Sequence, residues 1–453
     1  MTTAVAAAAG GLSVPLSSLK DRLLAASPGQ GNDLRRRLMR LAESAPSNFD
    51  AWWTAGKSVT DGPIDVIDFF SGAGGMSAGF RAVNGIAPSF RHILAVDVDA
   101  VANETYKRNL HLVPMLADVS EIRRKKAKFA SLLRDAGRRH ENPLVVIGCA
   151  PCQGFSSHRN QSALPDARND LFEDFGEIAV RLDADFIVIE NVPELCTDRH
   201  WPRVERVKAK LKKAGYNVHI AVHNFAEFGL PQERFRAVML AARQNFEPPE
   251  GYLNRSAFRT VRDAIGKLPY VEPGVAHSQD PLHQSAGHRA STIEMIKSVP
   301  KDGGRRRFDT GPASLQALAK RQGKPGYEDV YGRLYWDRPA ITITHYARNP
   351  ASGRFVHPEQ DRGLTAREAA LLQGFPSDYE FAGGFDDKFR QIGNAVPPLV
   401  AAHLALTLLA QMLDAPDHGP GDGVNGPLAK SVARLIPALK ARTVVGRQAW
   451  SQA

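Results

Sequence analysis

Six short apolar runs constrain the fold of this chain more than any other feature of its sequence. They are Ile64–Phe70, Ile93–Val96, Leu144–Ile147, Phe186–Ile189, Val218–Val222 and Ala237–Leu240, and helix-length stretches separate most of them. Continuous apolar runs of this length are typical of strands that are buried on both faces of a mostly parallel sheet. The pattern therefore predicts an α/β fold built on a doubly wound, mostly parallel, Rossmann-like sheet.

The alternation of strands and helices ends near Gln244, and a stretch rich in Pro, Gly, His, Ser and basic residues follows as far as about Arg338. Such a long stretch without a clear period is either a functional insertion or a second lobe. The 453 residues also exceed the usual span of one compact core. We expect an N-terminal extension that is partly helical or flexible (1–62), a first lobe (63–245), a smaller second lobe (246–384), a return to the first lobe (385–413), and a linker with a basic tail (414–453).

Local signals place individual helices. Thr365 followed three residues later by Glu368 is a capping box, so a helix is predicted over Leu364–Gly374. Ala401–Leu413 is apolar enough for a buried helix. Near the N-terminus Asp33–Glu43 predicts a basic helix. Its arginines either touch phosphate or form a solvated face, and they are Arg35, Arg36, Arg37 and Arg40.

The C-terminal residues have a different composition. Residues 415–427 are rich in Pro, Gly and Asp, which predicts a flexible linker. Leu428–Arg442 then predicts a basic amphipathic segment.

Composition narrows the class of protein. The net charge of +10 suits a polyanionic partner, although many ordinary surfaces carry a similar charge. No apolar stretch reaches the roughly 18 residues that a membrane span needs. Three cysteines allow no disulfide framework. These features predict a cytoplasmic protein.

A glycine-rich turn, Ser71-Gly72-Ala73-Gly74-Gly75, follows the first apolar run. In α/β sheets such a turn receives an adenosine-containing cofactor, although a tight turn alone explains the same residues. The glycines are more closely clustered than in the dinucleotide fingerprint, which favours a cofactor without phosphates. Asp97 comes directly after the next strand, where a carboxylate can accept hydrogen bonds from ribose hydroxyls.

Two side chains with reactive groups follow the third and fourth runs. Cys149 and Cys152 form a Cys-x-x-Cys, whose ordinary interpretations are a redox pair or half of a zinc site. Zinc needs two further ligands at matching spacing, and the sequence offers none, so we predict no metal. Glu190 follows the fourth run, where it is either a helix N-terminal carboxylate or a functional acid. A thiol and a carboxylate at neighbouring strand ends suggest covalent chemistry on an electron-poor ring.

The ordered motifs resemble the DNA (cytosine-5) methyltransferase family. They are the glycine-rich turn, Pro151-Cys152-Gln153, Glu190-Asn191-Val192, the Gln-x-Arg-x-Arg of residues 232–236, and Gln391-Ile392-Gly393-Asn394-Ala395-Val396-Pro397-Pro398. The resemblance covers roughly residues 64–412. It implies transfer of a methyl group from S-adenosyl-L-methionine to C5 of a flipped-out cytosine in double-stranded DNA. It also implies that residues 246–384 form the target-recognition lobe.

The resemblance assigns a role to each matching position. Cys152 is the nucleophile that adds to C6, Glu190 the acid that serves N3, and Arg236 the side chain that holds the base carbonyl O2. Arg234 joins the catalytic set, although a surface ion-pair ladder also explains the two arginines. Cys149 and Cys196 are interpreted as packing residues. The expected cofactor contacts are Phe70, Ser71, Gly72, Ala73, Gly74, Gly75, Asp97, Val98, Asp118, Val119, Pro151, Asn394 and Ala395.

DNA contacts are expected from basic and glycine-rich positions of the second lobe. They are His288, Arg289, Gly303, Gly304, Arg305, Arg306 and Arg307, although the triple arginine equally fits a solvated loop. We expect a monomer on DNA, with a companion restriction endonuclease as a further expectation. Two other classes stay open, namely an enzyme that modifies cytosine in structured RNA and a non-catalytic DNA-binding relative.

Overall fold

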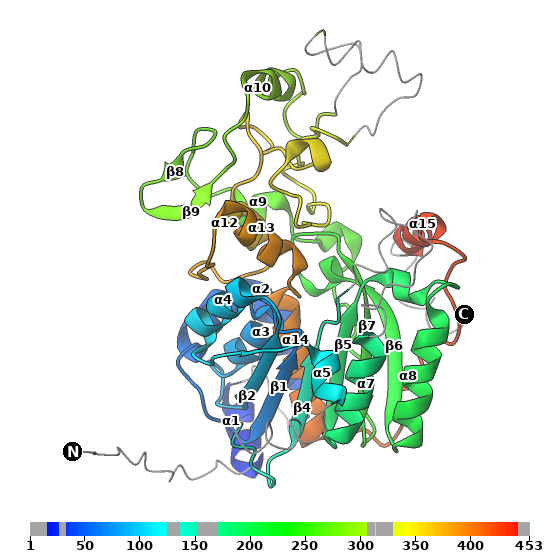
Figure 1. Ribbon diagram of the computed structural model, residues 1–453. Helices are drawn as coiled ribbons and strands as arrows, with labels where there is room; N and C mark the ends of the chain where they lie inside the picture. Colours follow the sequence, from blue (N-terminus) through cyan, green and yellow to red (C-terminus); the bar gives the residue numbers. More distant parts are fainter. Residues whose placement is uncertain are drawn as a thin grey trace, which may run out of the picture.

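A seven-stranded sheet forms the centre of the computed structural model, which describes residues 16–26, 33–124, 136–151, 171–305, 313 and 329–442 (Figure 1). Its strand order is β3-β2-β1-β4-β5-β7-β6, and only β7 runs antiparallel to its neighbours. The strands are β1 (Ile64–Phe69), β2 (Phe90–Asp97), β3 (Met115–Leu116), β4 (Leu144–Gly148), β5 (Phe186–Asn191), β6 (Asn217–Asn224) and β7 (Phe235–Ala242). All six predicted strands are confirmed, and so is the mostly parallel α/β fold.

Helices cover both faces of the sheet, and the sheet lies between two cores. The first core lies under α2 (Leu34–Gly56), α3 (Gly75–Val83), α4 (Ala100–Leu110) and α14 (Pro398–Leu413), and the second under α5 (Val119–Arg124), α7 (Leu171–Arg181) and α8 (Trp201–Lys213). β1, β4 and β5 are buried along their whole length, because each faces a helical layer on both sides. The predicted helix Ala401–Leu413 is confirmed as most of α14.

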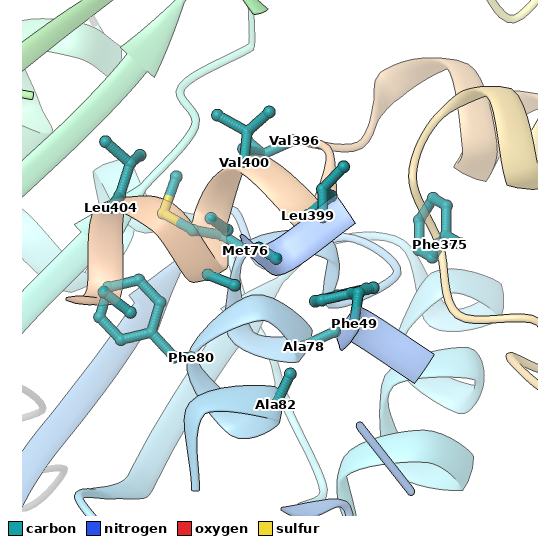
Figure 2. Packing of buried hydrophobic residues seen from close by; sticks show 14 of the residues in the cluster. Phe49, Met76, Ala78, Phe80, Ala82, Phe375, Val396, Leu399, Val400 and Leu404 are labelled. Carbon is teal, nitrogen blue, oxygen red and sulfur yellow. The ribbon is translucent and has the colours of Figure 1, made fainter. Parts of the chain in front are cut away.

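Two glycines allow α3 and α14 to approach closely. A Cβ on Gly79 would lie 2.5 Å from the Cβ of Ala401, and one on Gly75 would lie 2.3 Å from the carbonyl oxygen of Val396. Figure 2 shows Met76 and Phe80 of α3 beside Val400 and Leu404 at this contact. The contact therefore brings the glycine-rich turn next to residues more than three hundred positions later in the chain.

The helical stretch Phe385–Leu413 is long and apolar enough to cross a membrane, but 89% of its most apolar window is buried inside the protein. We therefore assign it to the core of the fold.

The N-terminal helix α2 is part of the first core and not a solvated arm. Phe49 and Trp53 are buried in it, and the indole of Trp53 donates a 2.7 Å hydrogen bond to Asp378. Arg35 lies 2.9 Å from Glu247, so this arginine holds α2 against the chain after β7. The sequence predicted a helix that ends at Glu43, yet α2 continues through Pro46. Before it, α1 spans Leu16–Ala26.

Residues 421–424 pair with the open edge of β6, where the sequence predicted a flexible linker. Val424 donates its backbone N–H to Ile220 at 2.8 Å, and Lys212 lies 2.6 Å from Asp422. Beyond them α15 (Val432–Arg442) buries Leu435 and Leu439 in the second core. The segment thus covers an edge strand that would otherwise expose unpaired backbone groups.

The second lobe contains little regular structure in its described part. Its elements are α9 (Val261–Ile265), β8 (Ala276–His277), β9 (Asp280–Gln284), α10 (Ala290–Lys297) and α12 (Ala366–Leu372), and α13 (Phe385–Asn394) leads back to the first lobe. Short 3-10 helices occur in this lobe at Arg255–Ala257 and Pro350–Ser352, and in the first lobe at Pro193–Cys196 and Phe225–Phe228. The capping box predicted for Thr365 and Glu368 is present in α12.

Buried arginines donate hydrogen bonds to backbone carbonyls in this lobe. Arg333, which is 1% exposed, donates to the carbonyls of Ile296, Val299, His357 and Gln360. Arg354 donates to the carbonyls of Gly303, Gly304 and Arg333. Arg362 forms a two-point ion pair with Glu368 and donates to Val271. These side chains connect separate segments of the lobe through hydrogen bonds to buried backbone carbonyls.

We expect His403 of α14 to make the folded state sensitive to acid. Its ring packs on Phe228 and Tyr252, and burial lowers its pKa from 6.5 to about 4. As the pH falls, His403 is protonated in the unfolded chain before it is protonated in the folded one. Its contribution to the free energy of unfolding is therefore fully present above pH 6.5 and is lost as the pH drops towards 4. This contribution amounts to roughly 3 kcal/mol.

The check is the melting temperature at pH 7 and pH 4.5. The melting temperature of His403→Phe should fall less between pH 7 and pH 4.5 than that of the wild type, because the phenylalanine ring cannot take up a proton. Replacement of the exposed His418 by Phe serves as the control. Equal losses in the wild type and in His403→Phe would contradict this explanation.

Candidate active site

The carboxyl ends of β1, β2, β4 and β5 open into a cavity of about 720 Å³. The strand order reverses direction between β1 and β4, and in α/β sheets such a point leaves a crevice where ligands bind. Residues 342–345 of the second lobe and residues 390–396 complete the described wall. The cavity thus collects segments from both lobes.

The turn after β1 is held in a strained conformation. Phe70 has φ +56°, which is uncommon for a bulky side chain, and Gly74 has φ +82° at the start of α3. Phe70 lines the cavity, and its ring packs beside that of Phe175 with 6.2 Å between the ring centroids. Ser71, Gly72, Ala73 and Gly75 line it as well. A Cβ on Gly72 would meet no atom within 4 Å, which shows that the space above the turn is open.

Asp97 connects this turn to the start of α4. Its two carboxylate oxygens accept 2.8 Å hydrogen bonds from the backbone N–H groups of Gly72 and Asp99. Burial raises its pKa from the usual 3.8. Each oxygen keeps a second lone pair for a ligand hydroxyl. Val98 beside it is 67% exposed, so the cavity has an apolar surface where a flat ring can pack.

Asp118 and Val119 lie outside the lining of the cavity. The backbone N–H of Ala117 donates to the carbonyl of Asp97, so Asp118 emerges close to the end of β2. The carboxylate of Asp118 is exposed and accepts a 2.7 Å bond from Ser120. Val119 is buried in the second core. Contact of these two residues with a cofactor stays a prediction.

A buried carboxylate that sequence analysis did not select also lines the cavity. Asp68 accepts a 2.6 Å hydrogen bond from Ser77, whose hydroxyl in turn accepts one from Tyr106. Burial raises the pKa of Asp68 to about 7. The available signal was that Asp68 is one of two acidic residues, with Asp65, in a strand whose other residues are apolar.

Glu190, at the end of β5, is 2% exposed and has partners on both carboxylate oxygens. Nε of Arg236 lies 2.9 Å from Oε1, and the thiol of Cys149 donates to Oε2 at 2.9 Å. Asn191 donates to the carbonyl of Ala150 at 3.2 Å. The end of β5 is therefore attached at two points to the segment that precedes Cys152. The packing interpretation of Cys149 missed this contact.

Arg234 and Arg236 have different surroundings, although the sequence grouped them. The buried guanidinium of Arg234 donates to the carbonyls of Ile343, Gly393 and Ala395. Arg234 thus joins the second lobe to the segment that carries Asn394 and Ala395, both of which line the cavity. Arg236 is directed at Glu190. Of the two, Arg236 has the contact expected of a catalytic group.

The predicted DNA contacts are scattered over the second lobe. Nε2 of His288 accepts a bond from the backbone of Gly363. A Cβ on Gly303 would lie 1.9 Å from the ring of Tyr335, and one on Gly304 would lie 1.9 Å from the carbonyl oxygen of Pro300, so neither position has room for a side chain. Arg289 and Arg305 are exposed.

Three predicted site residues, Cys152, Arg306 and Arg307, lie outside the described residues. Pro151, the last residue described before Cys152, lines the cavity. Within the described ranges, no group of three or more His, Cys, Asp or Glu side chains is arranged to hold a metal ion.

The sequence of this chain matches a known family. The family model for "C-5 cytosine-specific DNA methylase" matches residues 64–410. Type II methylase M.HgiDII of Herpetosiphon aurantiacus is 32% identical over 357 residues, which cover 76% of this chain and 94% of that protein. Type II methyltransferase M1.HphI of Haemophilus parahaemolyticus is 33% identical, with 76% and 87% covered.

A solved structure has the same fold. It is a putative DNA modification methyltransferase encoded within a prophage of E. coli, with a TM-score of 0.58 and 22% identity over 76% of this chain and 98% of that one.

Proposed function

Because this chain belongs to the family of C-5 cytosine-specific DNA methylases, we propose that its cavity holds S-adenosyl-L-methionine beside a cytosine rotated out of a DNA duplex. The chain is a DNA (cytosine-5) methyltransferase, and its methyl donor is S-adenosyl-L-methionine. One observation carries the assignment of the cavity. Glu190, Arg236 and the segment Cys149–Pro151 line the same space as the glycine-rich turn.

The β1–β2 end of the cavity fits the cofactor, which supplies an electrophilic methyl group when it is bound. Asp97 accepts hydrogen bonds from the ribose hydroxyls, and the exposed side chain of Val98 packs against the adenine. Asp118 serves the adenine amino group from the neighbouring strand end. Phe70 and Asn394 enclose the remaining part of the molecule. The open space above Gly72 supports this placement, because a side chain there would occupy it.

The β4–β5 end performs the chemistry on the base. Cytosine C5 is too weak a nucleophile to be methylated directly, so the thiolate of Cys152 adds to C6 and pushes electrons towards N3 and C5. Glu190 hydrogen-bonds and protonates N3, while Arg236 holds O2. After C5 is methylated, a base removes the C5 proton, the bond between Cys152 and C6 breaks to release the thiolate, and N3 returns its proton to Glu190. Arg236, which now contacts Glu190, lies where it can serve both groups.

DNA must open for this reaction, because stacking covers both faces of the cytosine ring, and flipping costs a few kcal/mol. The lobe of residues 246–384 forms the opposite wall of the DNA site and reads the sequence, with Arg289 and Arg305 as exposed contacts. His288, Gly303, Gly304, Arg306 and Arg307 complete the proposed contact set. The enzyme acts as a monomer in the cytoplasm, with a companion endonuclease. The Type II names of its relatives support this last point.

Bisulfite sequencing of DNA from cells that express the full chain tests the function. Cytosines within one short sequence should resist conversion, and cells with the empty vector should show none of them. The purified enzyme, incubated with S-adenosyl-L-methionine, should transfer no methyl groups to structured RNA. Label on RNA with fully converted DNA would favour the RNA-modifying class instead.

A further inference from the structure

We propose that Cys149 is a positioning residue, whose thiol holds the carboxyl group of Glu190 in the orientation that meets N3 of the cytosine. This inference rests on the proposed role of Glu190. The carboxyl is 2% exposed and its two oxygens have different partners, Arg236 from β7 on one side and Cys149 on the other. Glu190 alone has three side-chain torsions, so its orientation depends on these two contacts.

The two partners have different tasks during the reaction. Arg236 must also reach O2 of the cytosine, so its contact with Glu190 is shared with the substrate. Cys149 has no proposed contact with the base. The thiol is therefore the partner that can keep Glu190 in place while Arg236 engages the substrate.

The thiol is attached to a fixed support. The carbonyl of Ala150 accepts a hydrogen bond from Asn191, which is the residue after Glu190. Both sides of the contact between Cys149 and Glu190 thus belong to one connected unit at the ends of β4 and β5. A displacement of about 1 Å in a reacting group can cost about a hundredfold in rate, so loss of this contact should lower kcat.

The chemical nature of the group also matters. A thiol is a weak hydrogen-bond donor, and a hydroxyl is a stronger donor of similar size. Cys149→Ser should therefore keep the contact. Cys149→Val has similar bulk and no donor, so it should lose the contact while it fills the space.

The experiment is a double-mutant cycle between Cys149 and Glu190, measured as steady-state methyl transfer to a duplex that contains the site. We expect Cys149→Ala and Cys149→Val each to lower kcat about tenfold with the KM for DNA unchanged, and Cys149→Ser to stay within about threefold of the wild type. Glu190→Ala should cost about a hundredfold or more. In the Glu190→Ala background, Cys149→Ala should change kcat by less than about twofold, because no carboxyl remains to be positioned.

Cys196→Ala is the matched control, since Cys196 is buried, does not line the cavity and should keep wild-type kinetics. Melting temperatures identify any variant that fails to fold, and the Val and Ser variants then decide. An equal loss from Cys149→Ala with and without Glu190, or wild-type kcat in both Cys149→Ala and Cys149→Val, would overturn the role of Cys149. Wild-type kcat in Glu190→Ala would instead overturn the proposed function of Glu190.

Discussion

Replacement of Cys152 by alanine is expected to lower methyl transfer to DNA by at least about a thousandfold, because the ring cannot be activated at C5 without addition of a thiolate at C6. DNA binding should stay largely intact, since phosphate contacts supply most of the affinity and the thiol supplies almost none. Transfer of tritium from labelled S-adenosyl-L-methionine to DNA measures the first effect. A filter-binding titration measures the second.

The control for this variant is Cys196→Ala, which removes a thiol that lies in the second core. Burial raises the pKa of Cys196 to about 12, so this thiol is not a source of thiolate near neutral pH. A Cys152→Ala variant that retains a tenth of the wild-type rate of methyl transfer would contradict the covalent mechanism. Loss of DNA binding together with activity would instead indicate damage to the fold.

Much of the fold could be predicted because the signals were local or periodic. The strands β1, β4 and β5 are buried along their whole length because helices cover both faces, and the mainly apolar composition that such burial requires is visible in the sequence. The capping box of Thr365 involves residues only three positions apart. The ordered motifs also placed Glu190, Arg236 and the glycine-rich turn around one cavity, as the structure shows.

Other features depend on contacts between distant residues. The predicted helix ended at Glu43, yet α2 continues through Pro46 to Gly56, because it is held along its length by the first core. Residues 421–424 have a linker composition, but the unpaired edge of β6 fixes them. Composition does not predict the length of α2 or the conformation of residues 421–424, because both depend on the segments that they contact.

The site shows the same limit at the level of single side chains. Arg234 and Arg236 share one motif, but Arg234 is surrounded by the carbonyls of Ile343, Gly393 and Ala395. A guanidinium with several buried carbonyl partners holds segments together. Arg234 also lines the cavity, so its place in the catalytic set stays a prediction. Cys149 looked like a packing residue because its partner, Glu190, lies 41 positions away. The hydrogen bonds that hold the buried carboxyl group of Asp68 likewise come from residues outside its strand, Ser77 and, through Ser77, Tyr106.

The second expected result of large effect is a covalent complex with DNA that bears 5-fluorocytosine at the target position. Fluorine at C5 does not leave as a cation, so the enzyme can add Cys152 and methylate C5 but cannot complete the elimination that releases it. The complex should survive denaturing electrophoresis. It should form poorly without S-adenosyl-L-methionine and be absent with Cys152→Ser.

Glu190→Gln should slow formation of this complex strongly, because an amide cannot deliver a proton to N3. Cys196→Ala should form it at the wild-type rate, since its thiol is buried and does not line the cavity. These two variants separate the acid from a general effect on folding.

The most direct test of the covalent mechanism is therefore electrophoresis of the wild-type enzyme after incubation with the fluorinated duplex and S-adenosyl-L-methionine. The mechanism predicts a band at the summed mass of protein and DNA, with the link at Cys152. An enzyme that methylates C5 of ordinary cytosine and yet gives no such band would contradict addition of the thiol to C6, and with it the roles of Cys152 and Glu190.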